Sequence, residues 1–514
     1  MEIPSLFEVL LFLAAFFTAL LAYNNWLISI STSGKRLPPG LFPWPIVGNA
    51  PFLGSKPHKT FHELAKKYGP IYRIKLGSVK TIVLSDFKTI KEALVKQRQI
   101  FGGRMRFETY KYVQNGASNI FNDVSTQGEV WNKTKLEMLR HLHNLSTSTT
   151  VRKKSNEFIT DDVIYMLKEL ESASVTNFIN PEKTIRKAGA NTMCMICFGK
   201  RYAYDDKDFC ELLQANEVFS AVVSAGAMID TMPWITVFPK YRQILETYKK
   251  TMKHFYKWNL KRVEEIVTNL PDTNLMEPTN VVTSMIMSNG NGKITTKYME
   301  QIASICSELF GAGQDTTPTA FTWINNYLLL YPNVMKRMKK DIKETVGDRL
   351  PTLFDRPKLP YVDAFIHEIF RHSSFAPTSI PHGTLKKTTL CGYDIPQGTM
   401  VFANQYSVNR DPNVWPDPEK FDPMRFLCKD ESGELTMNGE AVENLLIFSM
   451  GLRKCPGSES AKTWLFLATA ILAQTCELMQ DPSHPPSLDA EFGLTLRPSC
   501  LRMKFRLNTL KTFQ

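Results

Sequence analysis

The chain lacks several signatures that would assign it to a common class of protein. It contains no G-x-G-x-x-G fingerprint, so the sequence predicts no nicotinamide or flavin site, and electrons for any redox reaction must come from another protein. It has no recognisable nucleic-acid-binding motif, and its Lys and Arg residues are scattered rather than clustered with aromatic residues. The net charge of +12 therefore favours an anionic membrane surface or an acidic protein as the partner.

Internal repeats and low-complexity linkers are also missing from the 514 residues, so we expect one large domain behind a short leader. The nine cysteines include a single C-x-x-C pair, Cys194 and Cys197, with no second pair to complete a zinc site. We interpret these two residues as buried helical thiols. The odd number of cysteines is typical of a reducing compartment.

The leader contains an unbroken apolar run, residues 9–23, which approaches the roughly 20 residues of a membrane-spanning helix. Glu2 and Glu8 precede the run and Lys35 and Arg36 follow it, which favours an uncleaved anchor over a cleaved signal peptide. The positive-inside rule then places the bulk of the chain in the cytosol. We therefore expect a membrane anchor over 1–30, a proline-rich hinge over 31–50 and a globular domain over 51–514.

One short segment, FSMGLRKCPG at 448–457, places a cysteine, Cys455, between Lys454 and Pro456 in a tight, basic turn. A buried thiol is one interpretation, because free cysteine usually behaves as a small hydrophobic residue. A thiolate is the other, because neighbouring cations lower a cysteine pKa and the thiolate is the form that binds metal. The segment itself leaves both open.

Three distant segments carry further polar residues in unusual places. GAGQDTT, 311–317, interrupts an apolar helical stretch; its glycines would let a flat ligand approach the backbone, and its acid and hydroxyl are the groups of a proton relay. The alternative is structural, because Thr and Asp within a helix also bend it by bonding to the preceding turn. Glu368 and Arg371 lie at i and i+3 of an amphipathic helix, a spacing that is more often a surface ion pair. Arg425 lies in a proline-rich segment, where we expect a carboxylate to bind it.

Taken together, these segments resemble the cytochrome P450 family. Residues 448–457 match its haem-binding F-x-x-G-x-R-x-C-x-G loop in full, and GAGQDTT, E-I-F-R and P-M-R-F follow its oxygen-activating helix, E-x-x-R helix and P-x-R-F element in the same order. The likeness runs from residue 1 to about residue 505. Within the family, 371–427 is most similar to the aryl-hydrocarbon-hydroxylase branch, family one, and 191–206 resembles the group that contains the steroid 17-hydroxylases.

The resemblance implies a mainly α fold with small β-sheets behind a single transmembrane helix, and haem b bound by the Cys455 thiolate. Thr316 and Asp315 would deliver protons. Haem contacts would come from Trp131, Lys135, His382, Arg453, Phe448, Gly451 and Gly457, although the family usually has arginine at the position of Lys135. Glu368, Arg371 and Arg425 would form a buried network behind the haem. Substrate contacts would come from Phe107, Ile120, Ala312, Pro377, Ile380, Leu494 and Thr495.

The expected function is that of a membrane-bound monooxygenase on the cytoplasmic side of the endoplasmic reticulum. It would insert one oxygen atom of O2 into a hydrophobic small molecule, aromatic or steroid-like, with electrons from an NADPH-dependent flavoprotein reductase and a possible role for cytochrome b5. An isomerase or dehydratase of the same fold is one alternative, but such members commonly lack the acid and alcohol that this chain has at Asp315 and Thr316. A haem sensor without enzymatic activity is the other.

Overall fold

The computed structural model describes residues 34–116, 129–147, 149–223, 228–270, 278–289, 294–499 and 501–508, with a few positions between 15 and 22. Almost all of the expected anchor, 1–30, therefore lies outside the described residues. The candidate substrate contact Ile120 also lies outside them. Within these residues, none of the helices combines the length and apolar character that crossing a membrane requires.

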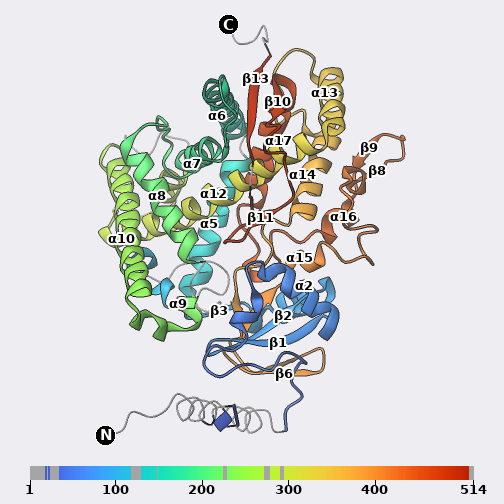
Figure 1. Ribbon diagram of the computed structural model, residues 1–514. Helices are drawn as coiled ribbons and strands as arrows, with labels where there is room; N and C mark the ends of the chain where they lie inside the picture. Colours follow the sequence, from blue (N-terminus) through green and yellow to red (C-terminus); the bar gives the residue numbers. More distant parts are fainter. Residues whose placement is uncertain are drawn as a thin grey trace, which may run out of the picture.

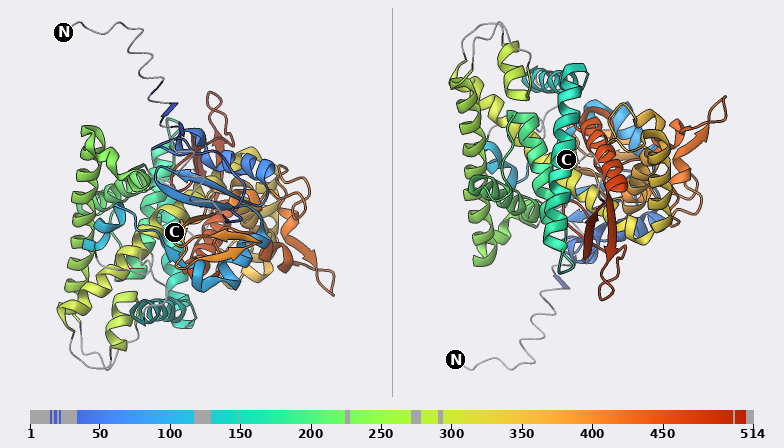
Figure 2. Two further views of the ribbon diagram at one scale, coloured as in Figure 1. Left: turned by 90° about the horizontal axis from the view of Figure 1, so that it is seen from below. Right: turned by 90° about the horizontal axis from the view of Figure 1, so that it is seen from above.

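The described fold is mainly helical with small sheets, as the sequence predicts. Figure 1 shows a sheet-rich region near the N-terminal end of the globular part and helices over the rest of the molecule. In both views of Figure 2 the green helices α8 (Lys207–Val222) and α10 (Pro239–Thr268) stay on one side, opposite the blue and orange segments that hold the sheet.

The largest sheet has five strands in the order β1-β2-β7-β4-β3. Strands β1 (Ile71–Leu76) and β2 (Val79–Leu84) form an antiparallel hairpin, whereas β2 pairs with β7 (Met400–Ala403) in parallel. The short strands β3 (Gly103–Arg104) and β4 (His382–Gly383) pair antiparallel, so that Arg104 faces His382 across the ladder. The sheet thus pairs Thr81 with Met400, 319 residues apart, and Arg104 with His382, 278 residues apart.

A single long helix, α12 (Thr296–Leu330), passes through the centre of the molecule, and most of its residues from Ile302 onward are buried. The side chain of Thr295 caps its N-terminus by accepting a hydrogen bond from the Tyr298 N–H. It ends at the residue preceding Tyr331 and Pro332, as expected where a proline follows.

Helix α7 (Glu182–Phe198) packs closely on α12 because each helix offers a glycine to the other. A Cβ on Gly189 would lie 2.3 Å from Cγ of Pro318, and a Cβ on Gly313 would lie 2.3 Å from Sδ of Met193. Gly313 thus contributes to the close packing of the two helices, and it also lines the active-site cavity beside Gly311. Cys194 and Cys197 are fully buried in α7, which confirms their interpretation as core thiols.

Two further helices complete the centre of the core. All but the first residue of α14 (Pro360–Ser373) and most of the apolar α17 (Ser458–Thr475) are buried. The other α-helices are α2 (Pro57–Tyr68), α3 (Phe87–Lys91), α4 (Arg98–Phe101), α5 (Glu129–Thr147), α6 (Thr149–Ser174), α9 (Met228–Thr231), α11 (Val281–Ser288), α13 (Pro332–Val346), α15 (Gln405–Val408) and α16 (Gly439–Asn444). The remaining strands are β5 (Thr388–Leu390), β6 (Tyr393–Ile395), β8 (Leu427–Lys429), β9 (Leu435–Met437), β10 (Cys476–Gln480), β11 (Ala490–Glu491), β12 (Arg497–Pro498) and β13 (Met503–Leu507).

Candidate active site

Cys455 follows a single 3-10 turn, η8 (Gly451–Arg453), in a loop that the backbone holds tightly. The Cys455 N–H donates to the Phe448 carbonyl at 2.9 Å. Gly451 has φ +72°, and a Cβ there would lie 1.8 Å from the Leu94 carbonyl oxygen, so only glycine fits. The loop is thus set by contacts with η2 (Glu92–Lys96) more than 350 residues earlier in the chain.

The Cys455 thiol opens into a cavity of about 380 Å³ that lies between this loop and α12. Burial raises the pKa of the thiol above its ordinary value, while the Gly457 N–H and the charge of Lys454 act in the opposite direction. The basic neighbours therefore do not by themselves produce a thiolate. A cation bound at the sulfur is needed to make the thiolate the stable form, because coordination deprotonates a thiol outright.

One end of the cavity carries three basic side chains, Arg104, His382 and Arg453. Arg104 is 5% exposed and donates to the Ile380 carbonyl at 2.9 Å. Burial lowers its pKa to about 10, and burial followed by the charge of Arg104 lowers the pKa of His382. An anionic group at this end would relieve both effects, because it would favour the charged form of each side chain.

Three of the expected haem contacts, Trp131, Lys135 and Gly451, are not among the described residues that line the cavity. The indole of Trp131 lies between two cations, with the Arg453 guanidinium 4.8 Å and the Lys135 ammonium 4.9 Å from its ring centre. Lys135 donates to the Leu452 carbonyl in the cysteine loop. Trp131 and Lys135 therefore position Arg453 and the loop around it.

Arg104 was missed by the sequence analysis. It lies in FGGRMRF, 101–107, where a second arginine, Arg106, is two positions away and nothing local separates the two. Only the pairing of β3 with β4 places Arg104 beside His382.

Helix α12 forms the opposite wall with Gly311, Ala312, Thr316 and Thr317. The hydroxyl of Thr316 donates to the Ala312 carbonyl at 3.0 Å, one turn earlier in the helix. A Cβ on Gly311 would have only ordinary contacts, with Asn216 and Phe255. The glycine therefore leaves more space in the cavity beside the helix than a larger residue would. The candidate acid and alcohol thus follow a stretch of helix that is open to the cavity.

Asp315 is 1% exposed and is bound by three partners from distant segments. Its Oδ1 accepts from Arg186 and from Arg497, each at 2.7 Å, and its Oδ2 accepts from the Thr495 hydroxyl at 3.0 Å. Both arginines also approach Glu182, at 3.8 and 3.5 Å, toward the protein surface. Sequence spacing did not indicate this cluster, because Arg186 and Arg497 lie 129 and 182 positions from Asp315.

Most expected substrate contacts line the cavity, namely Phe107, Ala312, Ile380, Leu494 and Thr495. Pro377 does not: it is buried, its carbonyl accepts from the Tyr406 N–H, and its neighbours Ala376 and Thr378 line the cavity in its place. Further walls that the sequence did not indicate come from α7, α8 and α10, with Ile196, Asn216, Phe219, Met252 and Phe255.

The expected Glu368, Arg371 and Arg425 network is brought together behind the cysteine loop. Glu368 and Arg371 are fully buried and form two parallel hydrogen bonds, of 2.7 and 2.8 Å. Arg425 approaches Glu368 at 3.6 Å, but its hydrogen bonds go to backbone carbonyls, including that of Asp417 at 2.8 Å, so the expected carboxylate is only a secondary partner.

An aromatic contact connects this network to the loop. The Phe370 ring on α14 packs edge-on against Phe448 with centroids 5.5 Å apart. The side chains of α14 therefore support the segment that carries Cys455.

A haem fits these residues. The cavity has one sulfur donor at its centre, apolar walls on both sides and a basic end that suits two carboxylates. No cluster of three or more His, Cys, Asp or Glu side chains suited to a metal ion occurs in the described part of the chain, so the single cysteine is the protein ligand that this arrangement offers.

Comparisons with known proteins agree with this geometry. The family model for Cytochrome P450 matches residues 38–505. The chain is 35% identical to human Cytochrome P450 1B1 over 487 residues, which cover 92% of this chain and 88% of the relative. It is 36% identical to Cytochrome P450 1A1 of Opsanus tau over 481 residues, or 90% of this chain and 89% of the relative. The chain therefore belongs to the cytochrome P450 family and is a haem-thiolate monooxygenase of the family-one branch.

Proposed function

We propose that this monooxygenase inserts one oxygen atom of O2 into a flat aromatic small molecule. The observation that carries the proposal is the set of phenyl rings around the distal half of the cavity, contributed by Phe107, Phe219 and Phe255. Phenyl faces and edges pack well on planar aromatic ligands, with about 0.5–1.5 kcal/mol per pair beyond area burial. The similarity to 1A1 and 1B1 supports the same class.

We assign the following roles toward the haem. A bound haem with a thiolate ligand supplies redox-active iron whose electron density favours O–O cleavage. Cys455 holds the iron and the Gly457 N–H steadies the sulfur, while Arg104, His382 and Arg453 hold the two carboxylates at the basic end. Phe448 and Gly451 shape the loop.

Thr316 and Asp315 deliver protons to the distal side in this proposal. The Thr316 hydroxyl can hold a water in the cavity while it donates to Ala312. Asp315 is bound by Arg186, Arg497 and Thr495, so it must exchange one of these bonds for a water before it can pass a proton inward. The route from solvent would follow Glu182 and the two arginines.

Electrons come from an NADPH-dependent flavoprotein reductase, since the chain itself has no nucleotide fingerprint. We propose that the reductase docks on the face behind the cysteine, where Lys454 and Arg140 are exposed, and that cytochrome b5 is a second donor. Complementary charge of this kind mainly raises the rate of association.

We further propose that the protein lies on the cytoplasmic face of the endoplasmic reticulum, with 1–30 as its anchor, 31–50 as the hinge and 51–514 as the monooxygenase domain. Two segments with exposed apolar side chains support this placement. Both contact the turn between β1 and β2, because the Gly77 N–H donates to the Val47 carbonyl at 3.0 Å and the Ser78 N–H donates to the Thr231 carbonyl at 3.2 Å. Exposed apolar surface of this extent marks a contact region. The side chains are Phe42, Trp44, Ile46 and Phe52 from one segment, and Trp234, Val237 and Phe238 from the other.

Spectral titration of the purified holoprotein with planar polycyclic aromatics and with steroids tests the substrate class. We expect the aromatics to bind more tightly, and Phe255→Leu to weaken their binding about tenfold through lost ring packing. Phe238→Leu is the control, because Phe238 is 54% exposed outside the cavity. Tighter binding of steroids, or equal effects of the two variants, would reject the aromatic assignment.

A second measurement separates the monooxygenase from the isomerase and sensor alternatives. We expect NADPH consumption to require both the reductase and the substrate, with hydroxylated product formed from O2. Product formation without reductase would instead indicate a rearrangement.

A further inference from the structure

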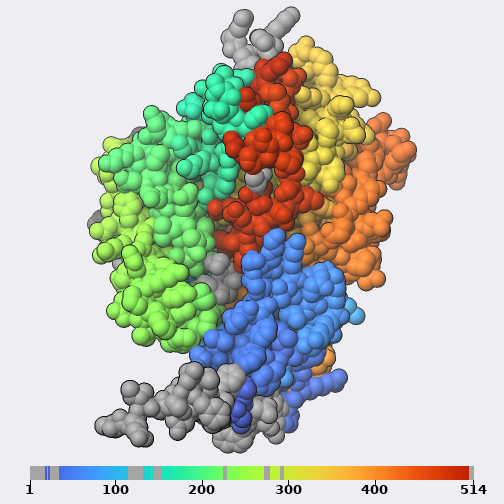
Figure 3. Space-filling view, viewed as in Figure 1, coloured from blue at the N-terminus to red at the C-terminus, as the bar shows by residue number. Residues whose placement is uncertain are grey.

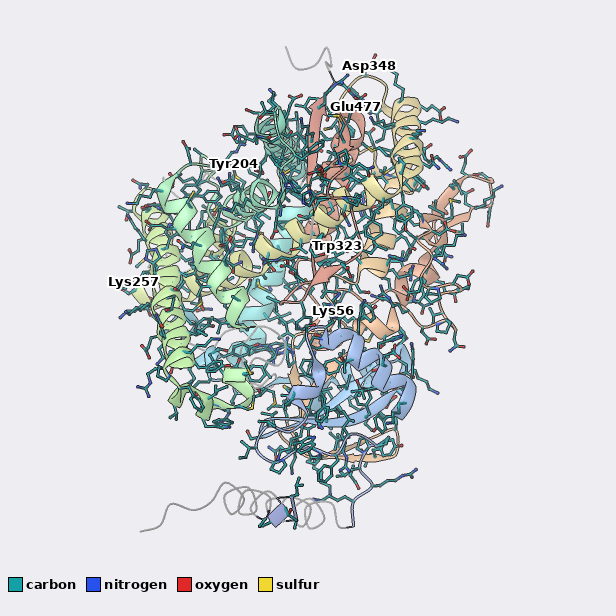
Figure 4. The ribbon with its side chains drawn as sticks, in the orientation of Figure 1. Lys56, Tyr204, Lys257, Trp323, Asp348 and Glu477 are labelled. Atoms are coloured by element: carbon teal, nitrogen blue, oxygen red, sulfur yellow. The ribbon has the colours of Figure 1, made fainter. Side chains whose placement is uncertain are left out.

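A second, smaller cavity of about 120 Å³ lies at the junction of α2, the C-terminal parts of α12 and α14, and the 488–496 segment. It shares no lining residue with the active-site cavity. Figure 4 shows the labelled Lys56 at the upper edge of the blue α2 region, below the labelled Trp323 of α12; both residues line this cavity. In Figure 3 the red C-terminal segment meets the blue N-terminal region on the same face.

The charged residues that line this cavity are mostly basic. Lys56, Lys59 and Arg410 contribute three cations, whereas Glu419 is the one carboxylate among the described lining residues. At the mouth, the Lys56 ammonium lies 3.2 Å from the Asp489 carboxylate; the lysine side chain is 40% exposed and the aspartate side chain 70%. The cations therefore outnumber the carboxylates even when Asp489 is included.

His58 lines the cavity and carries a buried polar atom without a partner. The residue is 2% exposed, lines the cavity, and its Nδ1 has no hydrogen-bond partner. Its ring is held in place by Phe492, stacked with centroids 5.7 Å apart, and by the edge of Tyr406 at 5.0 Å. A buried polar atom without a partner costs about 1–3 kcal/mol, so a ligand that accepts its proton would be stabilising.

Arg410 lies on the opposite wall of the cavity, where its neighbours hold the guanidinium in place. This residue is 7% exposed, and its guanidinium lies 3.8 Å from the centre of the Tyr406 ring. It donates to the Ser374 hydroxyl at 3.1 Å, and its Nε lies 3.3 Å from the Glu419 carboxylate, whose side chain is 75% exposed. His372 cannot compete for a ligand, because Nδ1 bonds the Tyr327 hydroxyl at 2.6 Å and Nε2 lies 2.9 Å from the Glu419 carbonyl. The cavity thus has a rigid cation on one side and movable lysines on the other.

We propose that this cavity is a binding site for a small tetrahedral oxyanion of the phosphate class. The volume equals that of about four water molecules at roughly 30 Å³ each, which is enough for a central atom with four oxygens. Lys56, Lys59 and Arg410 supply charge, and the neutral ring of His58, which lines the cavity, has one N–H to donate. A metal ion is disfavoured by the same three cations, and no cluster suited to one occurs in the described residues.

The electrostatics of His58 are consistent with this assignment. Burial, followed by the charges of Lys59, Arg410 and Lys56, lowers its pKa to about 4. The imidazole is therefore neutral at physiological pH in the absence of an anion, and an anion would act against each of these charge effects.

Hydrogen exchange of the full-length holoprotein in detergent provides the first test, with phosphate compared with chloride at equal ionic strength. We expect phosphate to slow exchange selectively at 56–60 and 488–497. Absence of protection there, or uniform protection over the whole chain, would overturn the proposal.

Calorimetric titration with inorganic phosphate provides the second test. Lys56→Gln combined with Lys59→Gln should weaken binding by about tenfold or more, because two of the three cations are removed. Lys67→Gln, an exposed lysine near the other end of α2, should stay within about twofold of wild type. Leu488→Glu places a carboxylate at the partly exposed rim and should also reduce phosphate binding.

Equal affinities of the lysine double variant and Lys67→Gln would show only diffuse attraction to a basic protein and would overturn the site. A parallel titration with glycerol phosphate identifies the source of the anion. Binding of both compounds indicates a phosphate ester, such as a lipid headgroup, that enters past Lys56 and Asp489. Binding of inorganic phosphate alone indicates a free ion.

Discussion

Cys455 illustrates at the residue scale how burial and charge compete. Lys454 is adjacent to it and the Gly457 N–H points at its sulfur, yet burial outweighs both and raises the pKa of the thiol. Bound iron favours the thiolate that the family requires, because coordination stabilises the deprotonated sulfur. Asp162 shows the same competition in a carboxylate.

Replacing the Cys455 sulfur tests directly whether this residue binds the iron. Cys455→Ser should eliminate the red-shifted band that a thiolate-bound haem shows when the reduced protein is treated with carbon monoxide. Cys428→Ser is the matched control, because Cys428 is exposed on β8. Survival of the band in Cys455→Ser would show that another residue holds the iron.

Asp162 on α6 provides a prediction about pH. The residue is fully buried, and its nearest cation is Arg201, with Nη2 3.2 Å from Oδ1. Burial raises its pKa from 3.8 to about 7, with Arg201 acting in the opposite direction. The folded state thus binds more protons than the unfolded state between about pH 4 and pH 7, and stability from this group declines as the pH rises through that window.

Asp162→Asn should remove this dependence, because the amide cannot ionise. Relative to wild type, its free energy of unfolding, measured by urea titration, should rise between about pH 5 and about pH 7.5, by an amount on the order of a few kcal/mol. Asp161→Asn, at the neighbouring exposed carboxylate, should leave the pH dependence unchanged. A constant offset between Asp162→Asn and wild type across this range would contradict the raised pKa.

At the scale of elements, close approach between segments determines where glycine is required. Gly189 and Gly313 let α7 and α12 pack together, and Gly451 lets the cysteine loop rest on η2. The sequence pattern marked Gly451 correctly as part of the loop. It could not show that Gly313 also serves helix packing, because only the position of α7 reveals that contact.

Gly451→Ala should therefore prevent formation of the cysteine loop. The added Cβ would lie 1.8 Å from a backbone oxygen, and the residue would keep a left-handed φ that costs alanine roughly 1–2 kcal/mol. We expect little or no haem incorporation, measured as Soret absorbance per protein. Gly439→Ala is the control, since a Cβ there meets nothing within 4 Å; normal haem content in Gly451→Ala would show that the loop can shift at low cost.

At the scale of the whole molecule, the buried Glu368 and Arg371 pair joins α14 to the segment around Pro418 and Lys420, and through Phe370 to the cysteine loop. All three guanidinium nitrogens of Arg371 donate hydrogen bonds, which makes the pair a structural junction between the helical core and the haem loop.

Glu368→Ala or Arg371→Ala should cost about 3–5 kcal/mol, because each leaves an uncompensated buried charge. We expect loss of folded, haem-containing protein and not merely slower turnover. Glu246→Ala, at an exposed ion pair with Lys249, should leave the yield of holoprotein unchanged. A stable, haem-replete Glu368→Ala protein with only reduced activity would place this pair in turnover instead of folding.

The amino-acid sequence by itself determined the cysteine loop, the acid and alcohol at 315–316, the i, i+3 pair on α14 and the family they indicate, because these depend on short spacings within one turn or helix. Only the tertiary structure decided that Arg104 joins His382, that Arg186 and Arg497 bind Asp315, and that Pro377 is covered while its neighbours line the cavity. The physical reason is that these contacts join segments brought together by strand pairing and helix packing. The spacing of residues within a short segment does not show which distant segments will contact each other.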